Sequence, residues 1–386
     1  SRPDYIALDP DAQTMDIDYR NNFTGKMTGE TMFYRPGMRY LPRNRYVIQY
    51  HPTLHYLEKD GYMPGFRFKR SYSMLEYVES DLNVGLETKE TFYKIAGWTK
   101  RPHKSIDQIN YHIFDFRGVR GSGLIFTKEI DRNNSVNGLK RMNFGFYENQ
   151  VKDLSRTHLY DNGRMIVAST KIHSIFSKIK NEIIFDFTPF KASDWSFSRI
   201  VLTNSFDERL GLFGARFRQI YGQIWSNQNE APLQERFNVE GAGSGDLYQK
   251  SYLRDNTSFY GNKEFFGRYH LPGDANLRAF GNQGLSGVEQ VFAITFEGFL
   301  SKSIAGINFE LAGFIDQGTL TGSKFVVGDK GFNNSTLVDY GIGLRISTSI
   351  YGQPIYLRFD KPLDAKIDGT SLEKMNEWVF SFQKSI

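Results

Sequence analysis

The chain has 386 residues, with 48 Lys and Arg against 43 Asp and Glu, a net charge of +5 and no cysteine. The lack of cysteine excludes disulfide scaffolds, Cys-ligated zinc, iron–sulfur clusters and thiol nucleophiles. A mean hydropathy of −0.47 and no apolar run near the roughly 18 residues of a spanning helix exclude a helical membrane protein. The positive charge is spread along the chain, so we expect no nucleic-acid partner.

Residues 1–43 differ in composition from the rest of the chain. They are first acidic and turn-rich and then rich in Arg and Pro. The opening residues, Ser1 to Asp4, have neither the basic nor the apolar region of a secretory signal peptide. We therefore expect that a leader has been removed or that an upstream segment precedes them. The predicted organisation is a linker or the end of an upstream β-domain over 1–43, followed by one transmembrane β-barrel over 44–386.

From about Asn44 onward, segments with period-two alternation are separated by turns rich in Gly, Asn, Asp and Ser. No long helical pattern lies between them. Counting from Gly61 gives about sixteen candidate strands. The predicted strands lie near 62–71, 81–90, 91–100, 107–117, 120–131, 138–150, 163–177, 180–190, 193–205, 210–222, 232–240, 287–301, 303–316, 337–349, 353–361 and 376–384.

The two faces of these strands differ in chemistry. In 289–300, Phe292, Ile294 and Phe296 fall on one face, and Thr295 and Glu297 fall on the other. A soluble β-sandwich also alternates, so the period alone leaves that alternative open. Full charges at mid-strand, apolar faces heavy in Phe and Ile, and Tyr and Trp near strand ends favour a membrane barrel. The predicted fold class is all-β, an antiparallel transmembrane β-barrel of about sixteen strands with a polar lumen.

The gap between predicted strands at 241–286 is too long for a turn, and loops of that length are usually functional or disordered. It contains the run Leu277-Arg278-Ala279-Phe280-Gly281. This run resembles the hydrophobic-Arg-Gly-aromatic signature on the inward-folding loop of the outer-membrane assembly and secretion superfamily, the BamA/TamA-type or bacterial surface antigen barrels. Further resemblances to strands of that superfamily lie at 56–65, 314–318 (Phe-x-Asp-x-Gly), 340–345 (Gly-x-Gly-hydrophobic-Arg) and 354–363.

The resemblance implies a lock in which Arg278 pairs with Glu297 and Asp316 while Phe280 accompanies it on the loop. The pattern agrees, because both carboxylates lie on polar faces of adjacent predicted strands and an unpaired charge in a narrow lumen is costly. Ala279 stands where the signature has Gly. The alternative is that Arg278 is an exposed loop residue and that the two acids are ordinary lumen charges.

The resemblance also implies a location in the outer membrane and a function in inserting or translocating protein or lipid there. The expected partners are outer-membrane lipids, periplasmic or surface proteins, and substrate proteins. About 60 residues precede the counted strands, too few for a POTRA domain plus a linker, so we expect none in this sequence. An alternative function is therefore a membrane anchor for an upstream zinc metallopeptidase or other hydrolase, because residues 6–22 resemble the closing strand after an aminopeptidase-type domain. An anonymous acidic linker and a soluble β-rich binding protein also remain open.

Candidate catalytic motifs are weak. His51, His55 and Glu58 lack the Glu that H-E-x-x-H chemistry places beside the first His, and Pro52 would break the required helix. The Ser among the glycines of 241–245 misses the G-x-S-x-G pattern, and no strand-to-helix elbow follows. The sequence therefore predicts no enzyme activity, no cofactor and no metal site within this chain.

Overall fold

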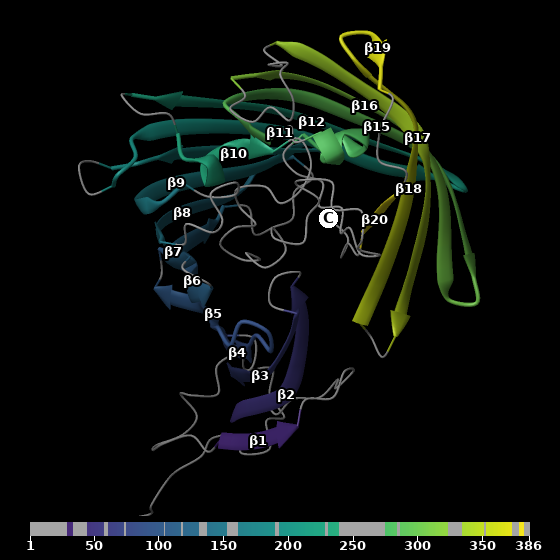
Figure 1. Ribbon diagram of the computed structural model, residues 1–386. Coiled ribbons are helices and arrows are strands. Elements are labelled where there is room, and N and C mark those ends of the chain that lie inside the picture. The colour runs from purple at the N-terminus through teal and green to yellow at the C-terminus, as the bar shows by residue number, and fades with distance from the viewer. Residues whose placement is uncertain are drawn as a thin grey trace, which may run out of the picture. The chain divides into compact units, whose positions relative to one another are not determined.

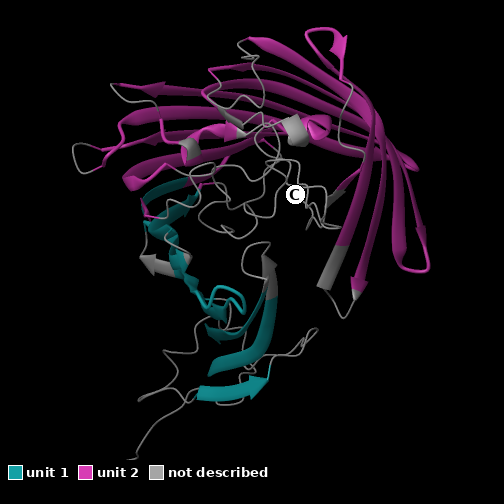
Figure 2. Ribbon diagram, viewed as in Figure 1, with its two compact units in different colours: residues 1–129, 143–149 teal, residues 130–142, 150–386 magenta. Residues whose placement is uncertain are grey.

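The computed structural model describes residues 29–33, 45–57, 61–72, 75–103, 105–116, 119–130, 137–152, 161–189, 193–227, 231–238, 275–283, 286–322, 334–350, 353–372 and 378–381. The chain divides into two compact units, residues 1–129 with 143–149 and residues 130–142 with 150–386 (Figure 2). Within the described ranges, no helix is long and apolar enough to cross a membrane.

The first unit is built from antiparallel strands joined by short connections. From β2 to β7, each strand pairs with the next one along the chain. The exception is β1, which pairs in parallel with β2. The strands are β1 (Gly29–Phe33), β2 (Tyr46–Leu57), β3 (Gly61–Tyr72), β4 (Glu76–Val84), β5 (Thr91–His103), β6 (Ile106–Phe116) and β7 (Val119–Glu129). Residues of β8 (Gly138–Val151) are divided between the two units.

The second unit continues the antiparallel order from β9 to β12, and β12 then pairs with β15. Strands β15 to β18 follow one another side by side (Figure 1). The last strand pairs with β18 as well. The strands are β9 (Gly163–Phe176), β10 (Ile179–Phe187), β11 (Phe197–Leu210), β12 (Phe213–Ser226), β15 (Gln290–Ile304), β16 (Ile307–Thr321), β17 (Ser335–Ile350), β18 (Gln353–Ile367), β19 (Thr370–Ser371) and β20 (Val379–Ser381).

Between β12 and β15 the described chain makes four short elements. They are the 3-10 helices η4 (Leu233–Glu235) and η5 (Arg278–Gln283) and a small ladder of β13 (Phe237–Asn238) with β14 (Ser286–Val288). The predicted strand at 232–240 is therefore wrong over 233–235, because the Glu235 N–H donates to the Pro232 carbonyl at 2.9 Å and closes a tight turn, whereas Phe237 and Asn238 do form the short strand β13.

Strand boundaries also differ from the predictions near the start of the barrel. The predicted strand at 81–90 is shorter and earlier, because β4 ends at Val84 and a turn follows, with the Gly85 N–H donating to the Glu90 carbonyl. Strand β2 precedes the point where the count of predicted strands began. Strand β1 lies within the stretch predicted as a linker or upstream β-domain.

The alternation predicted from the sequence is confirmed in β15. Phe292, Phe296 and Leu300 are exposed, whereas Ala293 and Glu297 are buried. We call the face that exposes apolar side chains the outer face and the opposite face the inner face. Large apolar residues on other strands are exposed in the same way: Met142, Phe144, Phe146, Ile183, Phe185, Phe309, Leu311, Ile315, Ile342 and Leu344.

Candidate functional site

The η5 turn presents a buried arginine to the inner face of the second unit. The side chains of Leu277, Arg278 and Phe280 are all fully buried. A Cβ atom added at Gly318 on β16 would lie 2.9 Å from Leu277 Cδ1. Glycine at 318 therefore leaves the room into which Leu277 packs, and the turn can approach the strands closely.

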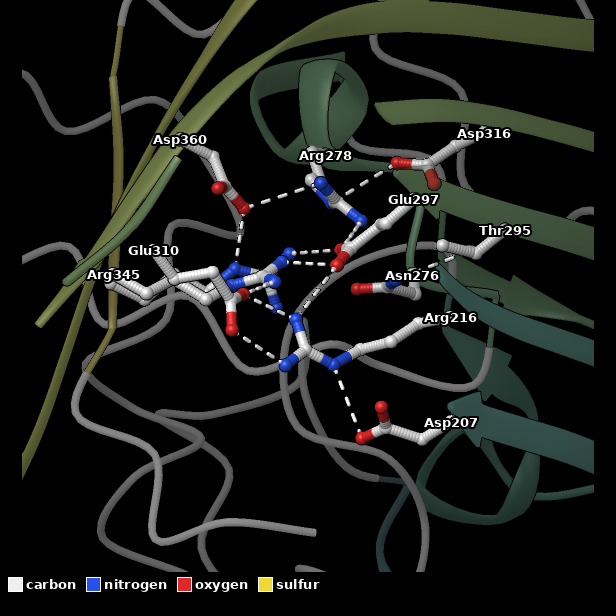
Figure 3. A network of polar contacts seen from close by, with 11 residues as sticks. Asp207, Arg216, Asn276, Arg278, Thr295, Glu297, Glu310, Asp316, Arg345 and Asp360 are labelled. Carbon is white, nitrogen blue, oxygen red and sulfur yellow. Dashed lines mark hydrogen bonds and ion pairs between the residues drawn. The ribbon is translucent and has the colours of Figure 1, made fainter. Parts of the chain in front are cut away.

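Arg278 reaches three carboxylates on three different strands (Figure 3). Its Nη2 lies 2.5 Å from Glu297 Oε1 on β15, and its Nε lies 3.2 Å from Asp316 Oδ2 on β16. Its Nη1 lies 3.4 Å from Asp360 Oδ2 on β18. The guanidinium carbon also stands 3.8 Å from the centre of the Phe314 ring, a cation–π distance. The structure thus brings Arg278, Glu297 and Asp316 together, with Phe280 buried in the same turn.

The backbone of the turn is held as well. The Ala279 N–H donates to Asp339 Oδ2 at 2.9 Å, and just before the turn the side-chain Nδ2 of Asn276 donates to Thr295 Oγ1 at 3.2 Å. Ala279 lies in the 3-10 helix, a conformation that any L residue adopts. The position where the resembling signature has Gly therefore accepts Ala here, with its side chain fully buried.

Three further arginines extend the network around Glu297 and Glu310. Arg358 Nη2 lies 3.2 Å from Glu297 Oε1, and Arg345 Nη2 donates to the other oxygen of Glu297. Arg345 Nη1 donates to Glu310 Oε1 at 2.5 Å, and Arg216 Nη2 donates to Glu310 Oε2 at 2.8 Å. Glu297 is therefore the shared acceptor of several guanidinium groups, and the network joins β12, β15, β16, β17 and β18.

Charge is nearly balanced in this cluster. Four guanidinium groups face five buried carboxylates: Arg216, Arg278, Arg345 and Arg358 face Glu297, Glu310, Asp316, Asp339 and Asp360. Burying a charge costs several kcal/mol unless a partner of opposite sign compensates it. The network consequently stabilises the fold only when it is complete, because removal of one member leaves a buried charge on another without compensation.

The sequence reasoning missed Asp360, Arg358, Arg345 and Asp339 as partners of Arg278 and its acids. A signal was present, because three of the four lie in the two C-terminal runs that resemble the superfamily. The glycines of the run at 340–345 have a physical role. A Cβ at Gly341 would lie 2.6 Å from the Phe314 ring, and one at Gly343 would lie 2.2 Å from Asp360 Oδ1. These glycines leave room for Phe314 and Asp360 beside Arg278.

This network of ion pairs and hydrogen bonds holds the η5 turn against the strands. Among the residues that the structure places, no group of three or more His, Asp or Glu side chains is arranged to hold a metal ion. His51 lies on strand β2, and the side chains of His55 and Glu58 lie outside the described residues, as does the glycine-rich run at 241–245.

Comparison with known proteins gives a structural likeness and no sequence match. No protein-family model and no curated protein matches the chain. BamA from Haemophilus ducreyi lacking POTRA domains 1–3 is similar with a TM-score of 0.54 at 12% identity, over 88% of this chain and 71% of that chain. CdiB from Escherichia coli is similar with a TM-score of 0.51 at 11% identity, over 86% of this chain.

These likenesses concern the fold alone, because the identities are low, and the chain spans only 60% of the length of that CdiB. The prediction of an all-β, antiparallel fold is confirmed. The chain has the fold of outer-membrane β-barrels and is structurally similar to BamA and CdiB.

Proposed function

We propose that the chain is an outer-membrane β-barrel that inserts or translocates protein or lipid substrates, and that Arg278 locks the η5 turn against the inner face of β15–β18. One observation carries the proposal: Arg278 is fully buried and contacts Glu297, Asp316 and Asp360 on three strands. This contact set includes the pairs that the superfamily resemblance implies. It occurs on a fold similar to that of BamA.

The distribution of apolar side chains supports the membrane location. Large apolar residues are exposed along the outer faces of strands in both units, for example Phe66, Phe68, Phe296 and Leu311. Soluble monomers rarely expose contiguous apolar patches beyond a few hundred Å². Lipid is the solvent in which such a face is favourable, and a polar inner face then lines a hydrophilic interior.

Substrate insertion can be tested in vesicles that contain the purified chain. We expect an unfolded outer-membrane barrel protein, added from denaturant, to fold several-fold faster into these vesicles than into vesicles without the chain. Arg278→Met should abolish most of this acceleration, because the turn leaves the inner face. The measurement is the fraction of substrate that acquires the heat-modifiable gel mobility of a folded barrel, followed over time.

The matched control is Arg120→Met, since Arg120 belongs to an exposed pair with Asp115 in the first unit. This variant should retain the acceleration. If vesicles with the chain are no faster than vesicles with an unrelated barrel, the insertion proposal is wrong. The anchor for an upstream hydrolase would then be the better account. The residues that suggested it, 6–22, lie outside the described part of the chain.

A further inference from the structure

A second buried arginine network lies apart from Arg278 in the sequence and uses different strands. Arg199 on the inner face of β11 is opposite Asp186 of β10 in the strand register. Its Nε donates to Asp186 Oδ2 at 2.9 Å, and its Nη1 donates to the main-chain carbonyl of Glu235 at 2.8 Å. The Glu235 carboxylate lies 3.1 Å from the same Nη1. One guanidinium therefore links two strands to the η4 turn.

All three members of this network are buried, with 5% of Arg199, 1% of Asp186 and none of Glu235 exposed. The charge-assisted bond to a main-chain carbonyl fixes the backbone of the turn in addition to its side chain. In the same way, Arg278 is accompanied by a bond from the Ala279 N–H to a strand carboxylate. Each turn is thus attached to its strands by a buried arginine network together with a main-chain contact.

Neighbouring contacts hold the same segment in place. The Gln234 side-chain amide exchanges two hydrogen bonds with the main chain of Asp161, at 2.9 and 3.2 Å. Arg236 Nε donates to the Ala231 carbonyl at 2.7 Å. The Phe237 ring packs against Gly222 on β12, where an added Cβ would lie 2.4 Å from it. Residues 231–238, which we call the entry segment, are therefore attached to the strands before η5 is reached in the chain.

The two networks draw on different strands. The Arg199 network uses β10 and β11, and the Arg278 network with its further arginines uses β12 and β15 to β18. The β13–β14 ladder pairs Phe237 with Val288, so the entry segment is also tied to the start of the chain that leads into β15. Interactions that share no partner contribute independently to stability, whereas members of one network do not.

We propose that Arg199 is a positioning residue that anchors the entry segment independently of Arg278. The chain then has two separate attachments, and η5 can leave the inner face of β15–β18 while residues 231–238 stay docked. The proposal does not rest on substrate insertion or translocation. It concerns only which arginine holds which segment.

The absence of cysteine from the chain allows a direct test by single-cysteine labelling in the full chain. Ala231→Cys reports on the entry segment and Ala275→Cys on the approach to η5, because these residues are 1% and 0% exposed. The rate of maleimide labelling is measured for each reporter in the folded, heat-modifiable fraction only. Arg199→Met should raise the labelling rate at position 231 about tenfold and change the rate at 275 by less than about twofold. Arg278→Met should give the reverse pattern.

Three further variants separate anchoring from a general loss of structure. Arg199→Lys keeps the charge but loses the planar fork, so it should give a labelling rate between those of wild type and Arg199→Met. Gly222→Ala displaces the Phe237 ring and should raise the rate at 231 without affecting 275. Gly313→Ala, whose added Cβ meets nothing within 4 Å, should change neither rate.

The proposal is overturned if Arg199→Met leaves the rate at 231 unchanged. It is also overturned if both reporters respond alike to either arginine substitution, because the two segments would then be docked as one cooperative unit. If Arg199→Met yields no folded fraction, Glu235→Gln takes its place. That variant removes one carboxylate but keeps the main-chain acceptor, and it should raise labelling at 231 alone.

Discussion

Arg278→Met should destabilise the folded chain by about 3–5 kcal/mol, because it leaves buried carboxylates without their shared cation. The side chains of Arg278, Asp316 and Asp360 are fully buried, so solvent does not screen the loss. The expected result is a lower free energy of unfolding in denaturant titrations of the detergent-folded or vesicle-inserted protein.

Two comparisons make the Arg278→Met result specific. Arg120→Met makes the same substitution at an exposed arginine and should lower the free energy of unfolding by less than about 1 kcal/mol. Adding Asp316→Asn to Arg278→Met should cost little more, because members of one network are not additive. Strictly additive losses in that double-mutant cycle would contradict a network and favour separate, unrelated contacts.

Glu297→Gln should be nearly as costly, by about 3 kcal/mol or more, because it leaves several arginines clustered without the negative charge that they share, and turns one acceptor oxygen into an NH2 donor. Glu297 Oε1 accepts from Arg278 at 2.5 Å and from Arg358 at 3.2 Å, and its other oxygen accepts from Arg345. Like charges in a partly desolvated site repel strongly. Denaturant titration measures the stability loss, and proteolysis at residues 275–283 reports whether η5 has become accessible.

The control for Glu297 is Glu310→Gln. Glu310 also bridges two arginines, Arg216 and Arg345, and both of these lie on strands and not on the η5 turn. Part of the Arg216 side chain is exposed, so water compensates some of the loss there. We expect Glu310→Gln to cost less than Glu297→Gln and to leave 275–283 protected. Equal proteolysis of the two variants would show that Glu297 has no special role in holding η5.

Much of the fold follows from local pattern. The alternation of Phe292, Ala293 and Phe296 determines which face of β15 is exposed, since side chains along a strand point to opposite sides. A one-residue slip in register would place Glu297 on the apolar face, so the pattern also specifies the pairing. The contact of Arg278 with Glu297 and Asp316 was expected from the resemblance together with their polar-face positions.

Other parts of the site depend on contacts between residues far apart in the sequence. Period-two alternation puts Arg199 on an inner face but does not say which segment it binds, and the same alternation wrongly predicts that Glu235 lies in a strand. The turn at 232–235 depends on a main-chain bond to the Pro232 carbonyl. The approach of η5 depends on Gly318. The space left by its missing side chain is occupied by Leu277, which lies about forty residues earlier in the chain. Such packing becomes visible only when the strands are assembled.

Chemical cross-linking between η5 and β16 tests most directly whether Arg278 holds the turn on the inner face. In the cysteine-free chain, Leu277→Cys combined with Gly318→Cys should form a disulfide readily under a mild oxidant in native membranes, because an added Cβ at 318 lies 2.9 Å from Leu277 Cδ1. Leu277→Cys with Gly313→Cys is the control, because position 313 is on the opposite face of the same strand and an added Cβ there meets nothing within 4 Å. The docked turn predicts cross-linking at 318, none at 313, and a strong loss at 318 after Arg278→Met. Equal cross-linking at 313 and 318, or full cross-linking at 318 after Arg278→Met, would contradict it.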